Sequence, residues 1–174
     1  MVYSIPSDLT IIDSDGNGMV DRAYFGDLGG QVWRADFDNV ADPSGITLTK
    51  FADLDNGDHQ PLFYPPSVSM NRDNGKRFLA VSLGSGDRTQ PMLENTGNGL
   101  FMLRDTDLET GAPAGTFTTI TTANIYDATN NDVGSDNPAT RQAAELALNT
   151  ARGWAVYLNA VSYTHLTLPT ICSV

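Results

Sequence analysis

The hydrophobic residues of this chain fall in short runs in which apolar and polar positions alternate, the pattern of half-buried β-strands. Turn-forming Gly, Asp and Pro residues separate the runs. The pattern predicts strands at residues 4–12, 22–27, 31–37, 46–51, 77–83, 99–104, 116–122 and 154–158. The segment Leu28-Gly29-Gly30 separates two of these runs and predicts a hairpin between them. We therefore expect an all-β chain of short strands joined by tight turns.

One segment has the period of a helix instead. Asn137 is a suitable N-cap, Pro138 suits the first helical position, and Gly153 lies beyond the end. One face of this segment collects four residues, Ala143, Leu146, Ala147 and Thr150. We predict a single short helix that packs by this face, and we interpret residues 124–137 before it as a loop.

Two further patterns bear on the architecture. Residues 60–68 contain three prolines, which predicts an edge strand or an extended loop. Gly-Asp turns recur near Gly26 and Gly86 between strand pairs. This loose repetition favours the blades of a β-propeller over a sandwich, although both are compatible with it.

Composition narrows the classes of partner. The 174 residues are enough for one domain and few for two. Ten Lys and Arg against 21 Asp and Glu give a net charge of −11, which argues against nucleic acid or an anionic membrane as the main partner. No stretch approaches the roughly 18 consecutive apolar residues of a membrane span. Only three of the acids are Glu, so most are Asp, which suits turns and hard cations.

The strongest chemical signal is the acidic loop, residues 13–21, with the sequence DSDGNGMVD. Oxygen-bearing side chains occupy its first, third, fifth and ninth positions, a glycine (Gly18) the sixth, and a backbone carbonyl is available at the seventh. This is the ligand order of an EF-hand calcium loop. The candidate Ca²⁺ ligands are Asp13, Asp15, Asn17, the carbonyl of Met19, and Asp21.

The match to an EF-hand is incomplete. The twelfth position holds Tyr24 where an EF-hand has a bidentate Glu, and the flanking segments are predicted strands rather than helices. We therefore expect a calcium loop carried on β-structure, and the alternative is an ordinary polar turn. Residues 53–58 are a weaker echo without the fifth-position ligand, which we interpret as a plain turn. His59 is a lone candidate base upstream of the last residues, so nucleophilic catalysis has little support and we predict no enzyme activity.

The last segment, residues 161–174 (VSYTHLTLPTICSV), differs from the rest. Aspartate is absent from it, and it holds the single cysteine, Cys172, and one of the two histidines. The string resembles a translated sequencing-adapter tail. We expect residues 161–174 to be non-native, the alternative being a genuine strand, and we assign residues 1–160 to one domain.

Several segments resemble, in order, a known family. They are TIIDSDGNGMVDRAYFGDLGGQVWRADF, HQPLFYPPSVSM, RFLAVSLGSGDRTQP, LFMLRD and RGWAVYL, at residues 10–37, 59–70, 77–91, 100–105 and 152–158. Together they are similar to the PilY family, the type IV pilus tip-associated adhesins. The first segment is the most specific, because the acidic loop, the hairpin and Trp33 occur together.

The resemblance implies a fragment of a C-terminal β-propeller of modified quinoprotein type, with Ca²⁺ on Asp13, Asp15, Asn17, Met19 and Asp21. It also implies a secreted protein at the cell surface or outer membrane, associated with the pilus and with minor pilins. Such a protein supports pilus biogenesis, retraction control, twitching motility and adhesion to host or abiotic surfaces. Residues 1–160 hold too few residues for a whole propeller.

Two alternatives remain open at this stage. A quinone-dependent dehydrogenase would share the propeller type, but it needs a Trp stacked on the cofactor and a catalytic carboxylate. For Trp33 we favour simple packing. An integrin-like calcium-loop repeat would show several equivalent acidic loops, and this sequence has one convincing loop.

Overall fold

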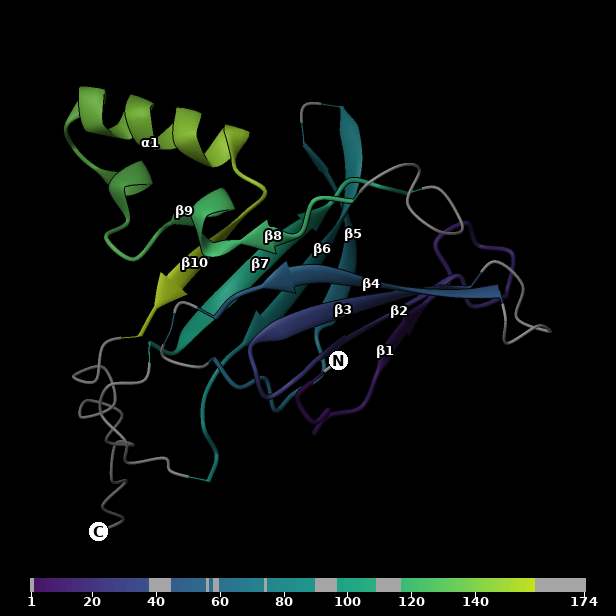
Figure 1. Cartoon of the computed structure of the whole chain (residues 1–174). Coiled ribbons are helices and arrows are strands. Elements are labelled where there is room, and N and C mark those ends of the chain that lie inside the picture. The colour runs from purple at the N-terminus through teal and green to yellow at the C-terminus, as the bar shows by residue number, and fades with distance from the viewer. Residues whose placement is uncertain are drawn as a thin grey trace, which may run out of the picture.

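The computed structural model describes residues 2–37, 45–55, 57, 60–73, 75–89, 97–108 and 117–158. Two five-stranded sheets dominate it (Figure 1). The first sheet has the order β1-β2-β3-β4-β8, with bounds Thr10–Ile12, Arg22–Gly26, Gln31–Phe37, Ile46–Asp53 and Ile120–Thr121. The second has the order β5-β6-β7-β10-β9, with bounds Ser67–Asp73, Lys76–Gly84, Gly99–Asp105, Gly153–Tyr157 and Tyr126–Asp127.

Both sheets are mixed in the same way. Their strands pair antiparallel except at one margin, where β8 runs parallel to β4 and β9 runs parallel to β10. The hairpin predicted between residues 27 and 31 joins β2 to β3, and the buried carboxylate of Asp27 organises its turn by accepting from the backbone N–H groups of Gly29 and Gln31. The Trp33 indole donates to the same carboxylate at 2.9 Å. Its half-buried ring packs against a cluster of Ala23, Phe25 and Ala35, so the packing interpretation of Trp33 agrees with the structure.

The core lies between the two sheets, as the alternation of side chains along each strand requires. The first sheet contributes Tyr24, Val32, Phe51 and Ala52, and the second contributes Leu79, Val81, Leu83, Phe101, Leu103 and Ala155. The rings of Tyr24 and Phe51 meet edge to face with their centroids 5.7 Å apart. The mostly-β prediction is confirmed, with two packed sheets and a single α-helix in the described part of the chain.

The helix α1 spans Pro138–Thr150, and the Asn137 side chain caps it by accepting from the N–H of Ala139 at 3.0 Å. The predicted packing face is wrong. Its four residues, Ala143, Leu146, Ala147 and Thr150, are all exposed, and the buried residue is Ala144. The helix lies beside the sheets rather than across one of them (Figure 1), so it has little to bury.

Three other expectations differ from the structure. Of residues 4–12, only Thr10–Ile12 form a strand. Residues 124–137, predicted as a loop, include part of the 3₁₀-helix η2 (Thr122–Asn124), the strand β9 and the 3₁₀-helix η3 (Asp132–Gly134). The predicted strand at residues 116–122 is reduced, within the described residues, to Ile120–Thr121. The proline-rich segment 60–68 agrees with its prediction in part, because its last two residues begin the edge strand β5 and residues 60–66 lie outside any strand. Residues 161–174 lie outside the described residues.

Candidate metal centre

The acidic loop connects β1 to β2, two strands that pair antiparallel with Ile12 opposite Arg22. This register closes the loop at its base, where the N–H of Asp21 donates to the Ile12 carbonyl at 3.0 Å. On the other side, the N–H of Phe37 at the end of β3 donates to the Asp21 carbonyl at 2.8 Å. The sheet therefore fixes the first and ninth positions of the loop beside each other.

Three of the five predicted ligands come together. Asp13, Asp15 and Asp21 each offer a carboxylate oxygen, and these atoms lie within 4.8 Å of one another. Asp13 and Asp15 are exposed, whereas Asp21 is only 6% exposed. A set of hard oxygen donors on a short loop fits a hard divalent cation such as Ca²⁺ better than a soft metal.

Backbone N–H groups at present satisfy the Asp13 carboxylate. It accepts from Gly18 at 2.7 Å, from Gly16 at 2.6 Å and from Asn17 at 3.2 Å. These hydrogen bonds, led by that of Gly18, hold the pKa of Asp13 below its ordinary value, because they favour the charged form. The side chain is therefore kept as the anion that a cation needs.

The Asp21 carboxylate is organised by the opposite side of the loop. Its Oδ2 accepts from the N–H and the hydroxyl of Ser14, both at 2.7 Å, and from the N–H of Asp15 at 3.3 Å. The loop is thus wound around its own carboxylates.

Asn17 and Met19 complete the predicted set. The Asn17 amide donates to Asp15 Oδ2 at 2.8 Å, and its Oδ1 accepts from the N–H of Met19 at 2.7 Å. The Met19 side chain is 63% exposed and points to no core, which agrees with a residue required only for its backbone. That the Met19 carbonyl is a ligand stays a prediction.

Two glycines permit this winding. Gly16 has φ +81° and Gly18 has φ +85°, in the left-handed region that other L-residues adopt at a cost. Gly18 occupies the sixth position, where the ligand order requires the sharp turn.

The residue at the twelfth position belongs to a different structure, which we call the buried ion network and which consists of Arg22, Tyr24, Arg34, Asp36, Asp105 and Asp107. Tyr24 points between the sheets, and its hydroxyl contacts Asp105 Oδ2 at 2.5 Å. Position 12 of the loop therefore cannot supply a ligand, because its side chain lies on the core face of β2. The missing Glu has a structural reason.

Arginines and aspartates in the buried ion network alternate. Asp36 accepts from Arg22 Nε at 2.7 Å and from Arg34 Nε at 2.8 Å, one on each oxygen. Arg34 extends to Asp105 at 2.9 Å and to Asp107 at 2.9 Å. Because Asp105 ends β7 and Asp107 follows it, the network joins the first sheet to the second.

Burial and charge act against each other in this network. Burial alone would lower the pKa of Arg34, but the charge of Asp105 and the hydrogen bonds to Asp36 and Asp107 outweigh it and raise that pKa. Burial, followed by the charge of Asp105, raises the pKa of the Tyr24 hydroxyl, which therefore stays neutral. The arginines are kept charged and the tyrosine uncharged.

Sequence reasoning found the loop but missed the network. The available signal was the two-residue spacing of Arg22 and Tyr24, and of Arg34 and Asp36, which places each pair on one face of its strand. Val32, a clear core residue, shares that face with Arg34. An arginine on the same strand face as a core valine indicates a buried charge, which needs partners of opposite charge.

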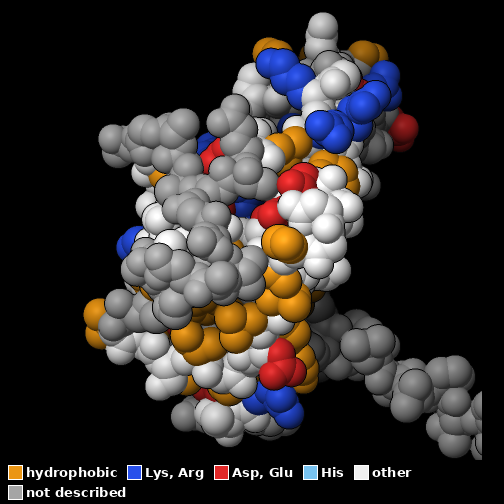
Figure 2. Space-filling model, turned by 90° about the vertical axis from the view of Figure 1, so that its right-hand side faces the viewer, with side chains coloured by type: hydrophobic (Ala, Val, Ile, Leu, Met, Phe, Trp, Pro, Cys, Tyr) orange, Lys and Arg blue, Asp and Glu red, His pale blue; other side chains and the backbone are white. Residues whose placement is uncertain are grey.

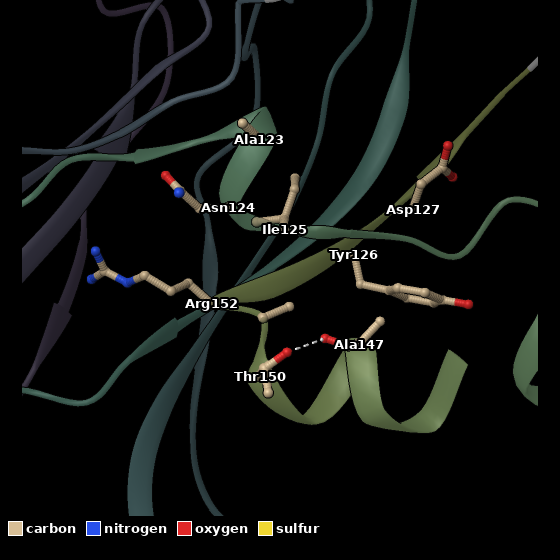
Figure 3. Close-up of a pocket in the computed structure, with 9 residues that line it drawn as sticks. Ala123, Asn124, Ile125, Tyr126, Asp127, Ala147, Thr150 and Arg152 are labelled. Atoms are coloured by element: carbon tan, nitrogen blue, oxygen red, sulfur yellow. Dashed lines mark hydrogen bonds between the residues drawn. The ribbon is translucent and has the colours of Figure 1, made fainter. Parts of the chain in front are cut away.

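A second concavity lies between the end of α1 and the segment 123–127 (Figure 3). Most of its polar side chains are engaged by the protein itself, whereas the buried Tyr126 hydroxyl has no hydrogen-bond partner within the described residues. The Thr150 hydroxyl donates to the Ala147 carbonyl at 3.0 Å, and Arg152 points out of the pocket and donates to the Thr118 carbonyl at 2.6 Å. This pocket therefore offers no convergent set of groups to a ligand.

No family model matches the sequence, and no curated protein matches it. Among solved structures, the chain is similar to the crystal structure of the Pseudomonas aeruginosa PilY1 C-terminal domain, with a TM-score of 0.60 and 17% sequence identity. The similarity covers 86% of this chain and 38% of that one, so the chain spans less than half of the matched domain. No helix in the described part of the chain is long and apolar enough to cross a membrane. The resemblance seen in the sequence therefore extends to the structure, and the chain has the fold of one part of the PilY1 C-terminal domain.

Proposed function

We propose that this chain is a Ca²⁺-binding, non-enzymatic module of a type IV pilus-associated surface protein. The observation that carries the proposal is the convergence of the Asp13, Asp15 and Asp21 oxygens within 4.8 Å, in a loop with the calcium ligand order. The likeness to a PilY1 domain supports the pilus setting.

In this proposal Asp13, Asp15, Asn17, the Met19 carbonyl and Asp21 hold the ion. Ca²⁺ takes six to eight oxygen ligands, so water completes the shell. The ion replaces backbone N–H groups as the partner of the Asp13 carboxylate, and it removes the repulsion among three carboxylates. Binding therefore stabilises the loop and, through Asp21, the start of β2.

The remaining elements of the proposal concern the whole protein. The two sheets are neighbouring blades of a partial β-propeller that residues 1–160 contribute, and residues 161–174 are not native. The protein acts at the cell surface with minor pilins as partners, where it supports pilus assembly, retraction control and adhesion. The order of the two sheets along the chain and the PilY1-like fold support this assignment.

Calorimetry of the full chain tests the metal. We expect about one Ca²⁺ per chain and much weaker binding of Mg²⁺, which demands a stricter octahedral shell. Asp15→Asn removes one charged ligand from the exposed side of the loop and should weaken Ca²⁺ binding at least tenfold. The matched control is Asp136→Asn, an exposed aspartate outside the loop, which should bind as the parent chain does. Equal affinity in both variants would refute the assigned ligands.

The pilus assignment needs its own experiment. Purified minor pilins are immobilised, and binding of the chain is measured with Ca²⁺ and with a chelator. The proposal expects Ca²⁺-dependent binding that Asp15→Asn abolishes. If the chain bound the pilins equally with Ca²⁺, with chelator and as Asp15→Asn, the proposed Ca²⁺-dependent function would be refuted, although the similarity in fold would stand.

A further inference from the structure

The strand β5 is an edge strand, and β1 lies near its start, where the Thr10 hydroxyl donates to the Pro66 carbonyl. The strand β5 stands at the end of the second sheet and pairs there with β6, and within the described residues no strand pairs with its other side. Four consecutive residues, Ser69, Met70, Asn71 and Arg72, are exposed. The Asn71 amide, from within the same strand, donates to the Ser69 carbonyl at 3.4 Å. Such an edge presents backbone groups that another chain can pair with.

The tip of the same hairpin is basic. Arg72 lies directly opposite Arg77, and Lys76 lies opposite Asp73. Like charges opposite each other across two strands are destabilising, so this pair costs stability in the isolated chain. Asp73 is engaged at 3.2 Å by Arg104. Among the described residues, Arg72, Lys76 and Arg77 have no ion-pair partner.

This cluster is unusual in so acidic a protein. The chain carries a net charge of −11, yet several Lys and Arg side chains gather at one end of the face shown in Figure 2. The tip of the hairpin β5–β6 projects beyond the part of β6 that pairs with β7 (Figure 1). At physiological salt, exposed charges more than about 8 Å apart interact weakly. A single extended peptide strand bound at this tip would therefore be attracted by the nearby cations and only weakly repelled by the acidic rest of the chain.

We propose that β5 is the docking edge for an extended, acidic segment of a partner protein. The segment adds to the second sheet as a sixth strand, and its backbone pairs with the open edge. Its carboxylates meet Arg72, Lys76 and Arg77. The two guanidinium groups can bind carboxylates in bidentate fashion, and the Lys76 ammonium adds a point charge. Docking thus relieves the repulsion between Arg72 and Arg77.

A peptide accounts for both observations, and an anionic lipid surface accounts for one. Lipid headgroups would satisfy the cations but would leave the polar backbone edge unpaired. The edge and the cations are contiguous on one hairpin, as recognition of a strand with a charged end requires. The proposal is independent of the metal loop, which lies between other strands.

The test uses the full chain and a fluorescent peptide as long as β5, with alternating Thr and Val and three Glu at one end. We expect binding by fluorescence anisotropy, with chelator as well as with Ca²⁺. A peptide with Lys in place of Glu should not bind, and neither should the acidic peptide with N-methylated backbone. The variant Arg72→Gln/Arg77→Gln should bind about tenfold more weakly, because it loses the cross-strand charge pair of Arg72 and the longer-range attraction of Arg77 for the acidic end.

Two variants control for folding and for net charge. Arg88→Gln/Arg141→Gln changes the charge equally at two exposed sites elsewhere and should bind as the parent chain does. Arg72→Lys/Arg77→Lys keeps the charge and should retain most of the binding. Equal binding of the N-methylated peptide would overturn strand addition. Capture of the chain by phosphatidylglycerol vesicles without any peptide binding would replace the peptide by a lipid surface and overturn the proposal.

Discussion

The molecule holds two clusters of carboxylates that solve the same electrostatic problem differently. In the buried ion network, Asp36 and Asp105 meet the guanidinium groups of two arginines, and all four side chains are at most 1% exposed. In the acidic loop, Asp13 and Asp15 are exposed and their hydrogen-bond donors are backbone N–H groups and an amide. One cluster includes its own cations, and the other lacks them.

The difference indicates what each cluster is for. A buried pair that brings its own counter-charges is complete without a ligand, and breaking it leaves a charge without compensation. Three carboxylates close together on a short loop, two of them exposed, repel one another until a cation binds. We therefore expect the network to contribute most of its stability under all conditions, and the loop to make its largest contribution when the ion is present.

The largest effect should come from Arg34→Ala. The substitution leaves Asp36 and Asp105 buried with half of their partners, and we expect a loss of about 3–5 kcal/mol in the free energy of unfolding. Urea unfolding followed by tryptophan fluorescence measures it, with and without Ca²⁺. A similar loss in both conditions would show that the network acts independently of the ion.

Two further variants give smaller expected losses in the free energy of unfolding, against which the loss for Arg34→Ala can be compared. Tyr24→Phe removes one hydrogen bond to a charged group and should cost about 1.5–3 kcal/mol, which keeps the comparison measurable if Arg34→Ala does not fold. Lys50→Ala breaks a half-exposed ion pair with Asp53 and should cost less than about 1 kcal/mol. If Lys50→Ala cost as much as Arg34→Ala, burial would not be the deciding factor.

The next effect concerns the ion. Calcium at a hundred times its dissociation constant should stabilise the parent chain by about 2.7 kcal/mol, and a chelator should remove this gain. Asp15→Asn, which should bind the ion at least tenfold more weakly, should lose about half of the gain or more, while its stability in chelator stays close to that of the parent. Thermal unfolding in both buffers measures this. Tyr24→Phe should keep the gain, and its loss there would show that the two clusters are one unit.

Much of the fold could be predicted because its signals are local. The strand at residues 31–37 was predicted with its observed bounds, and the helix start followed from Asn137 and Pro138. The helix face failed because periodicity states which residues share a face, and not which face has something to pack against. The same limit applies to β9, whose two residues are a strand only because β10 lies beside them.

The candidate site shows the same division. The acidic loop is contiguous, so its spacing is visible in nine residues. The buried ion network joins Arg22 and Arg34 to Asp105, which are far apart in sequence and meet only when the two sheets pack. Tyr24 belongs to both the loop pattern and the network. The sequence shows that it replaces the Glu of the calcium pattern, but it does not show that Asp105 is its partner.

A smaller effect should come from Gly18→Ala. Gly18 has φ +85°, and no atom lies near the position of an added Cβ, so the cost is backbone strain and not a clash. We expect a loss of about 1–2 kcal/mol in chelator. Gly86→Ala is a suitable comparison, because Gly86 is not in the left-handed region and meets only an ordinary contact at 4.0 Å. Equal costs would argue against a strained turn.

The smallest effect should be the pH dependence of the empty loop. The hydrogen bonds to Asp13 lower its pKa in the folded chain, so the stabilisation is present above the unfolded pKa of about 3.9 and is lost as the pH falls through the lower folded value. In chelator, the parent chain should exceed Asp13→Asn in stability at pH 7, and the two should converge below about pH 4. Urea titrations at a series of pH values measure the difference. A constant difference at all pH values would mean that the Asp13 side chain acts through its shape, and the contrast between a loop that needs a cation and a network that carries its own would then rest on Asp15 and Asp21 alone.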